Sequence, residues 1–119
     1  MSLTAGYQKF LSLGFIASSK VLNHAMTKIE WGNFNREEDA LKVIFKLAGD
    51  WYTKYETLIP PAYMMQVIEA ENIPGMLGQD KYQELIELVA YAYDSQGDAV
   101  KMEEHLLNVL SEFLQDRQV

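Results

Sequence analysis

The apolar residues between Asn35 and Pro61 recur at alternating three- and four-residue steps, which is the spacing of one face of an α-helix. That face consists of Leu41, Ile44, Ala48, Trp51, Tyr55 and Leu58. Further apolar residues flank it, so little of the helix surface is left for water. We therefore predict a helix over residues 36–59 that lies at the centre of the fold, because a helix with so wide an apolar face is packed on several sides.

Local signals mark both ends of this predicted helix. Asn35 is the expected N-cap, and Glu38 is placed to reach back to the cap amide as in a capping box. Pro60 and Pro61 are expected to end the helix, because a residue before proline disfavours helical geometry and proline has no amide donor. Pro61 also suits the first turn of a following helix, which we predict over residues 61–72.

The remaining apolar patterns also have helical spacing. Gly6 and Gly14 are candidates for a break or a close helix crossing in the first helix, and Asp80 is the expected cap of the fourth. The sequence of residues 73–78 predicts a loop. No stretch of the sequence alternates apolar and polar residues with the period of two that is typical of a strand. The predicted fold class is all-α, a single domain over residues 1–119 built as a bundle of four to five helices. Their approximate ranges are 3–30, 36–59, 61–72, 80–94 and 98–116.

Composition narrows the class of protein. The chain has 119 residues, of which 49% are hydrophobic and 23% charged, as expected of a globular domain. It contains no cysteine, which excludes disulfides, a thiol nucleophile and thiolate metal ligands. The uncharged run over residues 10–19 is too short to span a bilayer, and helical periodicity continues past it, which favours an amphipathic helix over a secretory signal. We expect a cytoplasmic protein that does not contact membranes.

The net charge of −7 is concentrated in the second half of the chain. Residues 1–59 carry seven basic and six acidic groups, whereas residues 60–119 carry three basic and eleven acidic groups. Nucleic-acid binding calls for a basic surface, so this distribution argues against it. It favours a partner protein with a basic surface.

The sequence contains no recognisable catalytic or metal-binding motif. His24 has no carboxylate at helical spacing, and His105 lacks the Glu-x-x-His spacing because Met102 occupies the glutamate position. The run over residues 94–98 has the spacing of a calcium loop but lacks its glycine and its bidentate glutamate. Phosphate-binding loops and nucleophile elbows are also missing. We therefore expect a protein that is not an enzyme and needs no cofactor or metal.

The aromatic end of the 36–59 helix and the segment after it are the most promising place for an interface or pocket, because aromatic and methionine side chains suit contact surfaces. The candidate residues are Trp51, Tyr52, Tyr55, Tyr63, Met64, Met65, Met76 and Leu77. The leading hypothesis is a non-enzymatic protein–protein interaction module, such as an adaptor, an assembly factor or an inhibitor or immunity-type protein. Its broad apolar faces leave a homodimer open as well. The alternatives are a small-molecule-binding domain with a pocket near Trp51, Tyr55 and Met65, and an acidic DNA mimic or regulatory protein.

Overall fold

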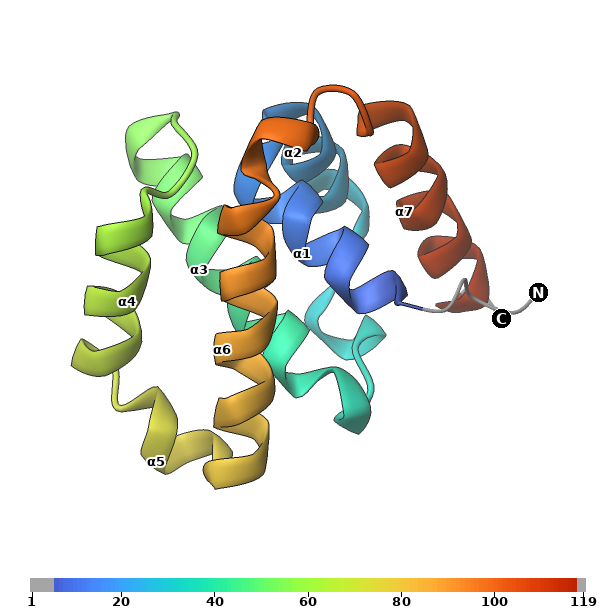
Figure 1. The fold of residues 1–119 in the computed structure, drawn as a ribbon. Helices are drawn as coiled ribbons and strands as arrows, with labels where there is room; N and C mark the ends of the chain where they lie inside the picture. Colours follow the sequence, from blue (N-terminus) through green and yellow to red (C-terminus); the bar gives the residue numbers. More distant parts are fainter. Residues whose placement is uncertain (1–5, 118–119) are drawn as a thin grey trace.

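The computed structural model describes residues 6–117 (Figure 1). The α-helices of this part are α1 Tyr7–Ala17, α2 Ser19–Lys28, α3 Asp39–Tyr55, α4 Pro61–Ala70, α5 Ile73–Leu77, α6 Gln79–Asp94 and α7 Glu103–Arg117. The short 3-10 helices are η1 Trp31–Asn33, η2 Arg36–Glu38 and η3 Gln96–Asp98. No strand occurs within residues 6–117, so the all-α prediction is confirmed, with seven α-helices instead of four to five. None of these helices is long and apolar enough to cross a membrane.

The helix predicted over residues 3–30 is broken at Ser18. Ser18 is extended, with φ −130° and ψ 112°, and its Oγ accepts the N–H of Val21 at 3.2 Å. It therefore acts as the N-cap of α2. Its hydroxyl also donates to Oε2 of Glu103 at 3.0 Å, which ties this break to the start of α7. A single helix was the wrong prediction here, and a serine rather than a glycine separates α1 from α2.

Gly14 lies at a close helix crossing, which is one of the two roles predicted for it from the sequence. A β-carbon at Gly14 would lie 2.6 Å from Cγ1 of Val21, which is closer than packed atoms approach. The missing side chain thus lets α1 and α2 pack tightly across the bend at Ser18. Gly6 has a different role, because it precedes α1 in the left-handed region with φ +77°.

The helix over residues 36–59 ends earlier than its prolines predict. Its last helical residue is Tyr55, because Glu56 adopts a left-handed conformation with φ 56° and ψ 27°. The Glu56 N–H still donates to the carbonyl oxygen of Tyr52 at 2.7 Å, so this residue closes α3. Pro60 and Pro61 are too late to end α3, but Pro61 opens α4 as expected.

Three further boundaries differ from the prediction. Residues 73–77, expected in a loop, form the short helix α5. Gly78, with φ +84°, occupies the cap position of α6, and Asp80 lies in the first turn instead. The last helix begins at Glu103 rather than near residue 98, because η3 and a turn through residues 99–102 come first.

The most enclosed helix is α1, and α3 is packed on several sides as the sequence predicted. The helix α1 packs against α2, α3, α6 and α7, and its six consecutive residues Leu11–Ile16 are all buried. The buried residues of α3 lie between Ala40 and Gly49, and its end is partly exposed from Trp51 onward. The helices α1, α3 and α6 contact one another, with α2 and α7 on one side and α4 and α5 on the other (Figure 1). One hydrophobic cluster contains residues from all seven α-helices.

Candidate functional site

Three aromatic rings converge where the end of α3 meets α4. Trp51 and Tyr55 are one turn apart on α3, so their side chains share a face. The ring centroid of Trp51 lies 4.2 Å from that of Tyr55 and 4.2 Å from that of Tyr63 on α4. Tyr55 is 45% exposed and Tyr63 is 37% exposed. These rings form part of a groove of ≈ 240 Å³, called the aromatic groove below, which is lined by Leu47, Asp50, Trp51, Lys54, Tyr55, Ile59, Tyr63, Val67 and Glu71.

The connection between α3 and α4 holds these rings in place. The indole N–H of Trp51 donates to Oγ1 of Thr57 at 3.1 Å. From α6, the hydroxyl of Tyr93 donates to the carbonyl oxygen of Ile59 at 2.7 Å. Burial raises the pKa of Tyr93, so its hydroxyl keeps the proton that this hydrogen bond requires. The aromatic groove is therefore preformed rather than assembled by a mobile segment.

Charged side chains line the aromatic groove beside the rings. Nζ of Lys54 lies 5.3 Å from the centroid of the Tyr55 ring, within the range of a cation–π contact. Asp50 contributes a carboxylate from α3 and Glu71 contributes one from the position directly after α4, and both face Nζ of Lys46, at 3.7 Å and 3.9 Å. The side chains in these two ion pairs are about half exposed, so the pairs contribute little to stability.

The other candidate residues named from sequence do not line the aromatic groove. The hydroxyl of Tyr52 accepts from Nδ2 of Asn23 at 3.1 Å, which turns this ring toward α2. Met64 is fully buried in the core. Met65 and Leu77 are partly buried and pack against that core. Met76 is 73% exposed on α5. The structure thus brings together three of the eight candidates, Trp51, Tyr55 and Tyr63.

Two other hollows are larger but contain no cluster of aromatic rings. One of ≈ 390 Å³ lies between the start of α1, η2 and α6, and is lined by the exposed glutamates Glu37, Glu84 and Glu87. The other, of ≈ 640 Å³, lies between α2 and α7 and is lined by exposed polar side chains that include Lys20 and His24. Neither combines rings and charges as the aromatic groove does, and residues 6–117 contain no group of three side chains able to hold a metal ion.

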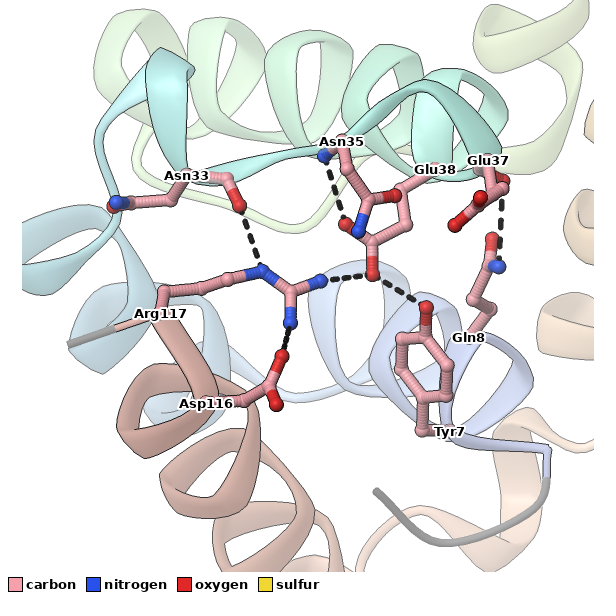
Figure 2. Close-up of polar contacts among 8 residues, drawn as sticks. All are labelled: Tyr7, Gln8, Asn33, Asn35, Glu37, Glu38, Asp116 and Arg117. Carbon is pink, nitrogen blue, oxygen red and sulfur yellow. Dashed lines mark hydrogen bonds and ion pairs between the residues drawn. The ribbon is translucent and has the colours of Figure 1, made fainter. Parts of the chain in front are cut away.

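A buried polar network was missed by the sequence reasoning (Figure 2). The carboxylate of Glu38 is fully buried. Its Oε1 accepts a hydrogen bond from the backbone N–H of Asn35 at 3.0 Å, which confirms the contact predicted between these two residues. Its Oε2 accepts hydrogen bonds from the Tyr7 hydroxyl and from Nη2 of Arg117. Nε of Arg117 also donates to the carbonyl oxygen of Asn33 at 2.9 Å. We call Tyr7, Glu38 and Arg117 the polar clamp, because they join α1, η2 and α7.

The polar clamp makes a prediction for alkaline pH. Burial and the neighbouring Glu38 carboxylate raise the pKa of Tyr7 from 10.0 to about 12. Below pH 10 this tyrosine is protonated in both states, so its contribution to stability is fully present. Between pH 10 and pH 12 the unfolded chain loses the proton first, and stability therefore falls as pH rises. Two pKa units correspond to at most about 2.7 kcal/mol, which partial exposure reduces to about 1 kcal/mol.

Urea unfolding at pH 8 and pH 11 tests this effect. We expect wild type to lose more stability between these pH values than Tyr7→Phe does. Tyr55→Phe is the matched control, because it removes a hydroxyl from an exposed ring outside the polar clamp. An equal alkaline loss in wild type and Tyr7→Phe would show that Tyr7 does not keep its proton in the folded state.

Comparisons with protein-family models, curated proteins and solved structures find no match to this chain.

Proposed function

We propose that this protein is a non-enzymatic protein–protein interaction module and that the aromatic groove is its contact surface. The observation that carries the proposal is the contact of Trp51 with two exposed tyrosines, Tyr55 and Tyr63, on a preformed groove. Tryptophan and tyrosine are enriched among the residues that dominate binding energy at protein interfaces. An adaptor, an assembly factor or an inhibitor would each use such a surface.

The size of the aromatic groove favours a protein partner over a small molecule. Its volume of ≈ 240 Å³ is below the range of about 300–1,000 Å³ usual for ligand pockets. The exposed rings of Tyr55 and Tyr63 also leave the groove open, whereas a ligand pocket encloses most of its ligand. One or two side chains of a partner protein fit this shape better.

Affinity capture from the native host with a matched set of variants tests the proposal. The double variant Tyr55→Ser/Tyr63→Ser removes the exposed rings and leaves the buried core intact. Val100→Ser is the control, because Val100 is an exposed apolar residue that does not line the aromatic groove. A partner should be enriched at least tenfold on wild type and on the control, and should be lost from the double variant.

The result that contradicts the proposal is equally specific. If wild type and the double variant retain the same proteins in the same amounts, the aromatic groove is not the contact surface. Urea unfolding of each variant checks that the changes act on binding and not on folding. Should the retained protein be a second copy of this chain, sedimentation must show a dimer for wild type and a monomer for the double variant.

A further inference from the structure

We infer that the aromatic groove receives a lysine or arginine side chain from a basic segment of a partner protein. This inference rests on the proposed function and adds the chemistry of the partner. Three features of the groove select a cation: an aromatic face that already carries one, carboxylates held only by solvated ion pairs, and a surrounding surface that is acidic.

The aromatic face shows that the site accepts a cation. Nζ of Lys54 lies 5.3 Å from the centroid of the Tyr55 ring, where the negative face of the ring attracts a positive charge. Lys54 is the chain neighbour of Tyr55 and is itself exposed, so its flexible side chain can move into water. A lysine or arginine from a partner can then occupy the same face of the ring, packed against Tyr55 and its neighbour Trp51.

The carboxylates give that incoming cation a second set of contacts. Asp50 on α3 and Glu71 directly after α4 line the groove, and Nζ of Lys46 lies 3.7 Å and 3.9 Å from their carboxylates. These pairs are solvated and therefore exchange readily with another cation. An arginine is especially suitable, because its planar guanidinium stacks on aromatic rings and donates several hydrogen bonds to carboxylates.

The surrounding charge makes a basic segment the occupant that fits. Glu56 directly after α3 and Glu69 on α4 are exposed, and the whole chain has a net charge of −7. This field attracts a basic segment and repels an acidic one. A purely apolar segment would remove water from the carboxylates of Asp50 and Glu71 without adding a cation to them, which opposes binding. Charge complementarity thus favours a basic segment over an apolar segment.

Peptide titration followed by NMR of the ¹⁵N-labelled full chain tests the inference. The reporter is the indole N–H of Trp51, assigned by its loss in Trp51→Phe. The probes are Ac-Gly-Arg-Gly-Lys-Gly-amide and the same peptide with norleucine in place of arginine and lysine. We expect the basic peptide to bind five- to tenfold more tightly than the norleucine peptide.

Two pairs of variants separate a cation–π contact from simple apolar packing. Tyr55→Leu keeps an apolar side chain but removes the aromatic face, and should weaken binding of the basic peptide about fivefold. Tyr55→Phe keeps the face and should bind nearly as wild type does. Lys54→Gln removes the resident cation and should strengthen binding two- to fivefold, whereas Lys101→Gln changes an exposed lysine outside the groove and leaves only the general effect of net charge.

Each alternative result overturns the inference in a recognisable way. If the norleucine peptide binds as tightly as the basic one, or if Tyr55→Leu binds as wild type does, the groove is an apolar anchor. That outcome leaves the proposed function standing, since capture by the aromatic groove is measured separately. If neither peptide moves the Trp51 signal at millimolar concentration, the basic segment is not the occupant. Diffusion measurements that show a groove-dependent dimer would replace it with a second copy of this chain.

Discussion

Arg117→Met is expected to lower the free energy of unfolding by about 3–5 kcal/mol near neutral pH, because it leaves a buried charge without its partner. The carboxylate of Glu38 is fully buried, and the Tyr7 hydroxyl and the Asn35 amide, which would still donate to it, carry no positive charge. The methionine side chain keeps much of the packing that the arginine has over the ring of Phe113, where its Cζ lies 4.3 Å from the centroid. Loss of charge compensation is therefore the main effect.

Urea unfolding of a double-mutant cycle separates the charge effect from packing. Glu38→Gln combined with Arg117→Met removes both charges and should recover more than half of the stability that Arg117→Met loses. Asp116→Asn is the matched control, because Asp116 also pairs with Arg117 but its side chain is 38% exposed. That control should change stability by less than about 0.5 kcal/mol. An effect of Arg117→Met no larger than that of Asp116→Asn would show that the buried pair is not needed.

The polar clamp and the aromatic groove lie at opposite ends of α3. Glu38 immediately precedes this helix, whereas Trp51 and Tyr55 are in its last two turns. Its 17 residues span about 25 Å at 1.5 Å per residue. A variant of the polar clamp that is still folded should therefore keep the geometry of the groove. Stability and partner binding can be changed independently in this chain.

Periodicity was sufficient to predict the fold class but not the helix boundaries. The break at Ser18 escaped detection because α1 and α2 both bury the face toward the core, so the three-four spacing continues across it. The end of α3 was not predicted because Glu56 takes a left-handed conformation that glycine usually adopts. Glu38 and Arg117 are 79 residues apart, and no local pattern indicates that they meet. Local signals succeeded where the partners are close in sequence, as for Asn35 and Glu38.

Two of the three rings of the candidate site could be placed together from their spacing, whereas the third depended on how α4 is rotated. Trp51 and Tyr55 share a face of α3 at any rotation, because they are four residues apart. The apolar residues of α4 surround much of its circumference, so its sequence does not determine which of them faces inward. Packing buries Met64 and Ile68, which leaves Tyr63 to face the aromatic groove. Only the tertiary structure shows that Tyr63 faces the aromatic groove and that Met64 is buried.

Gly14→Ala is expected to destabilise the protein by up to about 2 kcal/mol, the net of two opposed effects. Alanine is the better helix former by about 1 kcal/mol, so an exposed site would gain stability. At Gly14, however, the new β-carbon would lie 2.6 Å from Cγ1 of Val21, and overpacking of a core typically costs about 1–3 kcal/mol or more. The valine is fully buried and β-branched, so it cannot rotate away easily.

A second glycine in this chain provides a comparison. It shows whether the contact with Val21 or the helix propensity of alanine controls the change in stability. Gly49 is also buried in a helix, but a β-carbon there would meet Met26 at 3.9 Å, an ordinary contact. Gly49→Ala should therefore stabilise by up to about 1 kcal/mol, opposite in sign to Gly14→Ala. In urea unfolding, Val21→Ala should also offset part of the Gly14→Ala loss in the double variant. If Gly14→Ala stabilises the protein as Gly49→Ala is expected to do, the close packing of α1 on α2 does not require a glycine at position 14.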